Sequence, residues 1–419
     1  MRNQKINDLL RQASNSIQND NMNKGLELLT QILEIDPNNM DAIYNIGAIH
    51  FKYGKYQEAL SYFKRALEIN PKDVLSTFSI ACVYDNTNQK DKAIKWAKKA
   101  LEINPRHENS FRELLGLLSF KLRNNPNDAK TLFEIGDAYY NWGAIDESIK
   151  YYKQAVEVNP KFSNSWNKIG KIFFLKGNRE KGKEYFQKSL DVNPKNVSAL
   201  QNMGSYYAYK GDYSKALEFF NKSIELGQND PVLFFSVANV YKAMGQLATA
   251  ASFLERSIEL DPKYTDAFYV LGTINYKLRR YNKAIETYKR ALAKNIIKNQ
   301  RKEQIFFMLG ATYYELKQFN EAIEYYQKSL QINPNNANTL NSTGISYLEL
   351  RKEDEALKCF EKAVEINPNN SSYLSNLAAV YEGKDQQKAE ELYKKALMAN
   401  PNNKIAANLY SDFKKNKKS

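Results

Sequence analysis

Residues 163–196 read SNSWNKIGKIFFLKGNREKGKEYFQKSLDVNPKN, and this stretch of 34 residues decides the fold. Its proline, Pro194, follows Pro160 by 34 residues. The same interval recurs toward both ends of the chain, between Pro37, Pro71 and Pro105 and between Pro334 and Pro368. A fixed period of this length predicts a repeat protein, in which similar units stack on one another and bury a continuous core.

Small and aromatic residues keep the same register as the prolines. When each unit is numbered so that its proline is position 32, position 8 is Gly or Ala, position 11 is usually aromatic, and positions 20 and 27 are small. The quoted stretch shows the beginning of this pattern as Trp166-x2-Ile169-Gly170-x2-Phe173. The pattern resembles the tetratricopeptide repeat family, whose signature is W-x2-L-G-x2-Y…A-x3-F…P. The resemblance covers nearly the whole chain.

Each unit also has the marks of two helices joined by a turn. Apolar residues recur at spacings of three and four, which is the period of an α-helix. The residue before a proline avoids helical geometry, so the Asn-Pro or Asp-Pro near the end of a unit ends its second helix. The first helix ends near position 15, which is glycine in five units: Gly54, Gly143, Gly177, Gly211 and Gly245. With the handedness that the resemblance implies, the predicted fold is an all-α, right-handed α-solenoid (superhelix) of stacked antiparallel helix pairs, with about eleven tetratricopeptide repeats.

The repeats divide the chain into three predicted parts. Residues 1–128 hold a degenerate first unit (6–39), units 40–73 and 74–107, and one unpaired helix over 108–128, where we expect a break or kink. Residues 129–403 hold eight units: 129–162, 163–196, 197–230, 231–264, 265–302, 303–336, 337–370 and 371–403. Unit 265–302 carries about four extra residues near 294–302, as a longer helix or a loop. Residues 404–419 are predicted to form a capping helix and a basic tail that ends disordered.

The formal net charge of +14 raises the question of nucleic-acid binding. The basic residues, however, stand at position 25 or 26 of nearly every second helix, and many have an acidic residue four positions earlier. Examples are Glu184 with Lys188, Glu218 with Lys222, Glu286 with Arg290, and Glu324 with Lys328. Pairs at this spacing contribute roughly 0.2–0.5 kcal/mol each. We therefore expect a solvated outer face, and a basic strip that contacts nucleic acid is the alternative.

Composition also bears on location. No run of roughly 18 apolar residues exists, which argues against a membrane span. Residues 1–8 lack the apolar core of a secretion signal. Cys82 and Cys359 fall in units far apart in a rigid stack, so they are expected to be reduced residues and not a disulfide. A cytoplasmic protein is the expectation.

The resemblance further implies where a partner binds. In tetratricopeptide repeat proteins, positions 2, 5, 9, 12 and 13 of the first helix usually line a concave groove. Here position 5 is aromatic in six units and position 12 in five, with polar residues between them, although such rings could instead pack against the neighbouring first helix. Rings among amides and hydroxyls suit a peptide, which needs apolar anchors and hydrogen bonds. The predicted groove residues are Tyr44, Phe51, Phe78, Phe133, Tyr140, Asn167, Lys171, Phe174, Phe235, Asn239, Tyr269, Tyr276, Phe307, Tyr314 and Asn341.

Two residue patterns by which some members of the family recognise particular partners are absent or incomplete in this sequence. A carboxylate clamp for chaperone tails needs Lys at position 5 and Asn at position 9, but the one Asn at position 9, Asn239, follows Phe235 at position 5. An asparagine ladder at position 6, as in O-GlcNAc transferase, is present only at Asn45, Asn202 and Asn376. The resemblance therefore does not specify either of these partners.

Catalytic motifs fail a direct check. His50 takes the aromatic position 11, where a core role is expected, and His107 lies in a turn between units, so neither has metal-ligand spacing. Residues 177–183 (GNREKGK) nearly spell a P-loop, but the required Ser or Thr is replaced by Glu184 and no strand is predicted before them. The sequence thus predicts no enzyme, no cofactor and no metal.

The predicted function is that of a non-catalytic scaffold or adaptor that binds a peptide or helical segment of another protein in the concave groove. Two alternatives stay open at this point. The chain could regulate a separate enzyme, or it could associate with nucleic acid through its basic outer face. The identity of the partner and the oligomeric state are not predicted.

Overall fold

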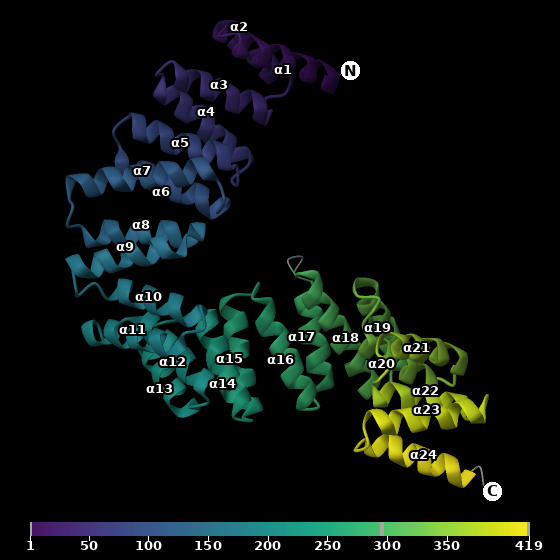
Figure 1. Cartoon of the computed structure of the whole chain (residues 1–419). Helices are drawn as coiled ribbons and strands as arrows, with labels where there is room; N and C mark the ends of the chain where they lie inside the picture. The colour runs from purple at the N-terminus through teal and green to yellow at the C-terminus, as the bar shows by residue number, and fades with distance from the viewer. Residues whose placement is uncertain (1, 294–296, 417–419) are drawn as a thin grey trace. The chain divides into compact units, whose positions relative to one another are not determined.

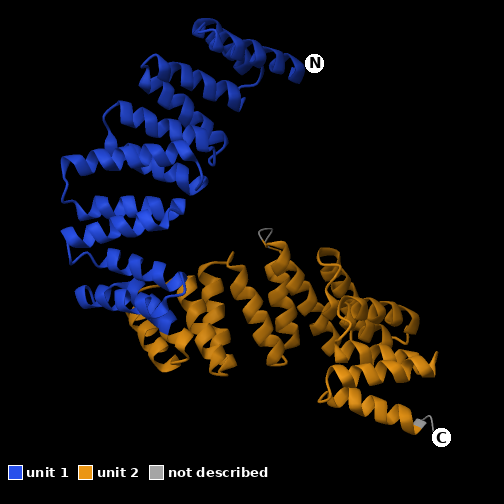
Figure 2. Ribbon diagram, in the orientation of Figure 1, with its two compact units in different colours: residues 1–206 blue, residues 207–419 orange. Residues whose placement is uncertain are grey.

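The computed structural model describes residues 2–293 and 297–416, and within these ranges it contains 24 helices and no strand (Figure 1). Eleven consecutive helix pairs account for all of these helices except α7 and α24. The predicted all-α solenoid of about eleven repeats is therefore confirmed. The contacts group the residues into two compact units, each of which contains several repeats (Figure 2). From here on, unit 1 means residues 1–206 and unit 2 means residues 207–419.

Unit 1 contains five helix pairs, the single helix α7 (Glu108–Asn124) and most of α12 (Val197–Lys210). The pairs are α1 (Arg2–Gln18) with α2 (Met22–Ile35), α3 (Met40–Lys52) with α4 (Tyr56–Ile69), α5 (Val74–Asn86) with α6 (Lys90–Ile103), α8 (Ala129–Trp142) with α9 (Ile145–Val158), and α10 (Ser163–Leu175) with α11 (Arg179–Val192).

Unit 2 begins within α12, continues with α13 (Tyr213–Glu225), and ends with the single helix α24 (Lys404–Asn416). Its pairs are α14 (Pro231–Ala243) with α15 (Leu247–Leu260), α16 (Thr265–Lys277) with α17 (Tyr281–Leu292), α18 (Asn299–Glu315) with α19 (Phe319–Ile332), α20 (Ala337–Glu349) with α21 (Glu353–Ile366), and α22 (Ser371–Tyr381) with α23 (Gln386–Ala399).

Most first helices begin after a side-chain cap at position 34 of the preceding repeat. Asn39 accepts a hydrogen bond from the backbone N–H of Ala42 at 3.0 Å, and Asp73 accepts one from Ser76 at 2.7 Å. Such a cap satisfies one of the N–H groups that the first helical turn leaves without a partner. The residue at position 31, before the proline of position 32, ends the second helix of one repeat. The residue at position 34 then starts the first helix of the next repeat.

The turn inside ten of the eleven described repeats has a left-handed residue at position 15, and the exception is Asp385, whose φ is −152°. The five predicted glycines all adopt positive φ, for example +71° at Gly54 and +90° at Gly143. Five other repeats place a different residue there with the same backbone: Asp20, Asn88, Arg279, Lys317 and Arg351, with φ between 57° and 60°. Side chains other than glycine cost roughly 1–2 kcal/mol in this region. The packing of the two helices therefore dictates the turn even where the sequence gives no glycine signal.

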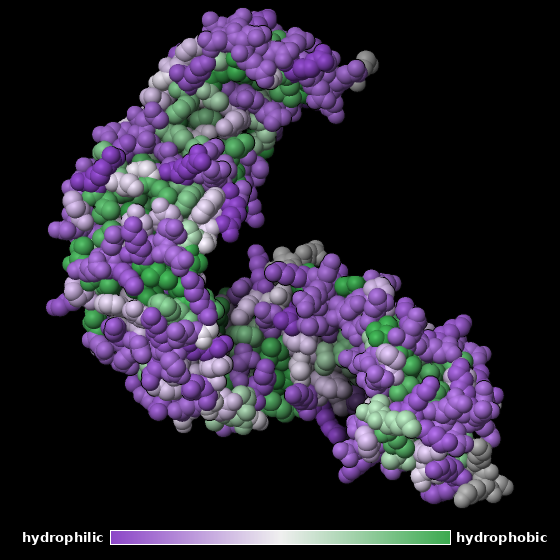
Figure 3. All heavy atoms as spheres, in the orientation of Figure 1, coloured by the Kyte–Doolittle hydropathy of each residue, from purple (hydrophilic) through white to green (hydrophobic). Residues whose placement is uncertain are grey.

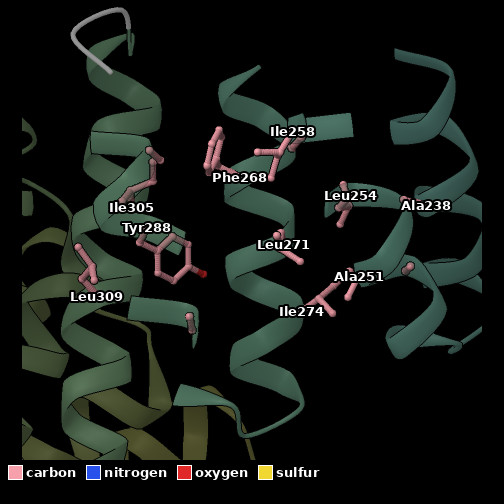
Figure 4. Packing of buried hydrophobic residues seen from close by; sticks show 14 residues of the cluster. Ala238, Ala251, Leu254, Ile258, Phe268, Leu271, Ile274, Tyr288, Ile305 and Leu309 are labelled. Carbon is pink, nitrogen blue, oxygen red and sulfur yellow. The ribbon is translucent and has the colours of Figure 1, made fainter. Parts of the chain in front are cut away.

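Position 8 is small because the ring at position 24 of the same repeat lies directly against it. A Cβ atom placed on Gly272 would lie 2.4 Å from Cε1 of Tyr288, and Gly310 and Gly344 meet Tyr326 and Phe360 in the same way. The Tyr288 ring is fully buried, in a cluster that extends from α14 to α18 (Figure 4). Interiors packed at this density leave no space for an added methyl group.

The single helices differ in role. Helix α7 buries Phe111, Leu114 and Leu118 in a cluster shared with α5, α6 and α8, so the chain continues its core through the irregular repeat. Helix α24 buries Tyr410 and Phe413 against the last pair, and its role as a cap stays a prediction. The break expected at 108–128 and the three-part domain division stay predictions. Residues 417–419, at the end of the predicted tail, lie outside the described residues.

The extra residues predicted near 294–302 fall where α17 gives way to α18. Helix α17 ends at Leu292 and α18 begins at Asn299, and residues 294–296 lie outside the described residues. Helix α18 is 17 residues long, whereas the preceding first helix, α16, has 13. The part of the insertion that is described therefore lengthens a helix.

Candidate functional site

We call the side chains at positions 2, 5, 9, 12 and 13 of the first helices the inner face, and we treat it separately in each unit. In unit 1 the predicted aromatic residues of this face are all half-buried: Tyr44 and Phe51 on α3, Phe78 on α5, Phe133 and Tyr140 on α8, and Phe174 on α10. Tyr44 and Phe133, at position 5, rest on the position 24 rings of their own repeats, Phe63 at 5.6 Å and Tyr152 at 5.5 Å, whereas Phe78 packs against His107 at 5.4 Å. The rings are thus fixed by the core on one side and left accessible on the other.

Helices α8 and α10 are joined across the inner face by Lys168. Its ammonium lies 5.7 Å from the ring centroids of both Phe133 and Tyr140, and it forms an ion pair with Asp137 at 2.8 Å. The Tyr152 hydroxyl donates to the same carboxylate oxygen at 2.5 Å. Contacts of a cation with ring faces and with a half-buried carboxylate hold these side chains in one arrangement.

Amide side chains connect successive first helices in both units. Asn202 on α12 donates from Nδ2 to Oδ1 of Asn167 on α10 at 2.8 Å, and Asn376 on α22 donates to Asn341 on α20 at 2.9 Å. Asn167 is only 5% exposed, whereas the predicted groove residue Lys171 is exposed. Two asparagines of the interrupted ladder therefore bond to position 5 of the preceding repeat, and Asn45 donates to the backbone carbonyl of Asp41.

In unit 2 the inner-face tyrosines at position 12 donate to glutamates at position 13 of the next repeat. Tyr276 on α16 bonds to Glu315 at 3.4 Å, and Tyr314 on α18 bonds to Glu349 at 3.2 Å. Burial, and then the neighbouring glutamate, raise the pKa of each tyrosine above its ordinary value. The hydroxyls thus stay protonated near neutral pH and remain donors.

The remaining inner-face rings of unit 2 also have fixed neighbours. The Arg301 guanidinium lies 4.3 Å from the centroid of the Tyr269 ring, and Arg301 pairs with Asp266 at 2.7 Å. Phe307 packs on the Tyr326 ring at 5.7 Å. Phe235, on α14, packs edge-on against Tyr264 at 5.1 Å. All of these predicted rings are half-buried, so they provide a preformed apolar surface with polar groups between them.

A pair of lysines adds positive charge to this face of unit 2. Lys242 at position 12 of α14 and Lys277 at position 13 of α16 are both exposed, and Asn239 lies one helical turn from Lys242. Burial, and then the charge of Lys277, hold the pKa of Lys242 below its ordinary value. Two exposed cations on neighbouring first helices therefore make this part of the inner face positively charged.

Sequence patterns missed the partners that join neighbouring repeats, namely Lys168, Arg301, Glu315 and Glu349. The signal was available as a spacing. Tyr44 with Ser79, Asn167 with Asn202, and Asn341 with Asn376 are each 35 residues apart, which is one repeat plus one residue. A search for polar residues at this spacing would also have found Arg301 with Asp266 and Tyr314 with Glu349, but not Lys168 with Asp137 or Tyr276 with Glu315.

The basic residues at positions 25 and 26 of the second helices, which form the outer face, contact carboxylates or rings near them in the fold. Lys222 pairs with Glu218 at 2.7 Å and Lys328 with Glu324 at 2.6 Å, as the sequence predicted. In the other two predicted pairs the cation lies over a ring: Lys188 over Trp166 and Tyr185, and Arg290 over Phe268. Figure 3 shows polar residues over most of the surface in view, with apolar residues between them.

The histidines and cysteines that the sequence analysis considered all have defined surroundings in the structure. His50 stacks on Tyr62 at 5.6 Å, and His107 precedes α7 with Nδ1 2.6 Å from Oγ of Ser110. Cys82 and Cys359 are free, and burial raises the pKa of the Cys82 thiol to about 12. Within the described residues, no group of three or more His, Cys, Asp or Glu side chains is placed to hold a metal ion.

None of the helices in residues 2–293 and 297–416 is both long and apolar enough to cross a bilayer. The cytoplasmic location expected from the sequence stays a prediction.

The geometry defines a class of protein: a helix-pair solenoid in which the first helices within each unit carry aromatic and polar side chains on one face. Family models for the tetratricopeptide repeat match residues 41–73, 77–107, 136–177, 162–229, 304–336, 337–370 and 359–391. The chain belongs to the tetratricopeptide repeat family. A model for the anaphase-promoting complex, cyclosome, subunit 3 matches residues 209–291. No curated protein matches the chain.

Solved structures are similar to parts of the chain. YrrB, described as a TPR protein with an unusual peptide-binding site, is 26% identical, with 45% of this chain and 96% of that one covered at a TM-score of 0.38. MamA is 26% identical, with 43% and 96% covered at 0.39. The C-terminal part of a TPR repeat-containing protein from Cytophaga hutchinsonii is 19% identical, with 58% and 98% covered at 0.49.

Proposed function

We propose that this chain is a non-catalytic scaffold that binds a peptide or helical segment of a partner protein along the inner face of its first helices. The observation that carries this proposal is the repeated row of half-buried rings with polar groups between them. Apolar surface that is partly open and already rigid suits recognition, because little ordering entropy is lost when a partner binds.

The polar groups between the rings would set the direction and register of the bound segment. In unit 1 the exposed Lys171 lies one turn after Asn167 on α10, close to where Lys168 joins α8 and α10. In unit 2 the exposed Lys242 and Lys277 offer ammonium groups to an acidic side chain. In peptide recognition, aromatic rings usually supply the binding free energy, and charged groups determine which sequence is bound.

The outer face supports this choice over nucleic acid. Several of its lysines and arginines already contact a carboxylate or a ring on the same face, as Lys222, Lys328 and Lys188 do. Nucleic-acid binding gains much of its free energy when lysines and arginines of the protein neutralise phosphates and release the counterions condensed on the nucleic acid. Charges neutralised within the protein contribute less to that release.

The proposal predicts that bulky side chains on the inner face block a peptide selected on the whole chain. We would select dodecamer peptides from a random phage library, synthesise the consensus peptide with a fluorescent label, and measure Kd by anisotropy. Lys171→Trp tests unit 1 and Lys242→Trp tests unit 2, because both residues are exposed on first helices. At least one variant should weaken binding about tenfold or more, which corresponds to about 1.4 kcal/mol.

Lys153→Trp on α9 and Lys283→Trp on α17 are the matched controls, since both lysines are exposed on second helices. These variants should bind the peptide as the natural chain does. Unchanged affinity in both inner-face variants, or a loss confined to the controls, would show that the inner face is not the binding surface.

A further inference from the structure

The single helix α7 lies at a pocket of a kind that also occurs between regular repeats, where smaller cavities of about 370 and 330 Å³ are lined by α19, α20 and α21 and by α15, α16 and α17. Here α8 is the third helix of the junction, and Lys98 on α6 pairs with Glu134 on α8 at 2.9 Å. Between α6, α7 and α8 lies a cavity of about 490 Å³. We call it the junction pocket, and it lies entirely within unit 1.

The floor of the junction pocket is apolar and rigid. Phe111 and Trp142 stack with their ring centroids 4.4 Å apart and their planes within 5°. Leu114 on α7 is 2% exposed and stands beside Phe111 in the same core cluster. Arg106 donates a hydrogen bond to the backbone carbonyl of Trp142, and its guanidinium lies 5.5 Å from the Trp142 ring. The carbonyl contact and the stacking fix the floor in place.

The walls of the junction pocket carry more negative than positive charge. Its lining includes the carboxylates of Glu102, Glu134 and Asp137 but only one ammonium, that of Lys98. Lys98 is occupied by Glu134, and Asp137 is held on Oδ1 by Lys168 from outside the pocket. Glu102 is exposed and forms no ion pair within the described residues. One carboxylate therefore has no cation of its own.

Asp137 lines the junction pocket and also stands at position 9 of its repeat, on the inner face of α8. The same Lys168 that bonds Asp137 lies over the rings of Phe133 and Tyr140, two of the predicted groove residues. A segment lying on α8 and α10 would thus pass the pocket and could insert one side chain into it. An aliphatic stem suits the floor, and a cation suits Glu102.

We propose that the junction pocket binds the side chain of a lysine or arginine from a partner peptide, with its stem on Leu114 and Trp142 and its cation at Glu102. This proposal rests on the proposed function, because it names the kind of residue that the inner face selects. An anionic side chain is disfavoured, since three carboxylates surround the space.

The pocket can be tested with single amino-acid probes on the full chain. Nα-acetyl-lysine amide and Nα-acetyl-arginine amide would be titrated while the indole N–H signal of Trp142 is followed by nuclear magnetic resonance and assigned with Trp142→Phe. The neutral analogues Nα-acetyl-norleucine amide and Nα-acetyl-citrulline amide serve as controls. We expect saturating shifts with the basic probes and at least about fivefold weaker binding of the neutral ones.

Two variants separate the pocket from the general surface. Glu102→Gln should weaken the basic probes about threefold or more, and Asn141→Phe should abolish their binding by filling the pocket from an exposed position. Glu157→Gln, at an exposed position on α9, should change nothing. Equal binding of neutral and basic probes, or shifts that survive Asn141→Phe, would overturn the proposal.

The outcome is distinguishable from failure of the proposed function. If the basic probes bind but no selected peptide uses the inner face, the pocket is confirmed and the peptide-scaffold proposal is wrong. If peptides bind the inner face and the probes leave Trp142 unchanged, the junction pocket is refuted alone.

Discussion

Gly272→Ala is expected to lower the free energy of opening of helices α16 and α17 by at least about 2 kcal/mol. The new Cβ would lie 2.4 Å from Cε1 and 2.6 Å from Cζ of Tyr288. The Tyr288 ring is fully buried and therefore cannot move away without displacing α18 residues such as Ile305 (Figure 4). The gain of roughly 1 kcal/mol that alanine gives a helix is smaller than this clash.

Native-state hydrogen exchange is the suitable measurement for Gly272→Ala, because long repeat arrays do not unfold as one cooperative unit. Gly116→Ala is the matched control: Gly116 lies within α7 and a Cβ there meets nothing within 4 Å. This control should stabilise its helix by about 0.5–1 kcal/mol. Combining Gly272→Ala with Tyr288→Leu should cost less than the sum of the two, since the clash is removed. Full additivity would contradict the contact.

Removal of α24, by ending the chain after Asn403, is expected to destabilise the last helix pair by about 3–6 kcal/mol. Two rings of α24, Tyr410 and Phe413, pack on the fully buried Tyr393 at 5.6 and 5.7 Å. Each large apolar side chain contributes roughly 1.5–3 kcal/mol when buried. Without them Tyr393 faces water, and a solenoid that lacks its cap tends to lose its terminal repeat and its solubility.

The truncated chain would be compared with the full chain by hydrogen exchange of α22 and α23 and by light scattering during heating. Ile405→Ser provides the control, because Ile405 is on the same helix but 68% exposed. It should leave exchange in α22 and α23 within about 0.5 kcal/mol of the natural chain. Unchanged protection after removal of α24 would mean that the helix does not act as a cap.

The helix pairs could be predicted because the residues within each repeat indicate where its two helices end and how closely they pack. Pro194 and Gly177 end helices in the quoted stretch, and Gly170 allows close packing on Phe186. The irregular helix was also predictable, since Pro126 follows Pro105 after too few residues for a pair. What the local pattern could not give is the left-handed turn at residues such as Arg279 and Arg351, where packing overrides the preference of the side chain.

The candidate site was predicted less completely, for a physical reason. Position numbers place Tyr276 and Tyr314 on a shared face, but they do not show that these tyrosines donate to Glu315 and Glu349 of the next repeats. Such contacts depend on the offset between stacked repeats. The junction pocket likewise combines residues of α6, α7 and α8, and the contact of Lys98 with Glu134 becomes visible only when these helices are assembled.

The most direct test of the central claim is to locate a bound peptide by photo-crosslinking. p-Benzoylphenylalanine would replace Tyr140 or Tyr314 on the inner face, and Tyr151 or Tyr325 on the second helices of the same two repeats, all four being half-buried. The selected, labelled dodecamer would be irradiated with each full-length variant. Crosslinking from at least one inner-face position and from neither second-helix position is the predicted result. Crosslinking from Tyr151 or Tyr325 alone would contradict recognition along the first helices.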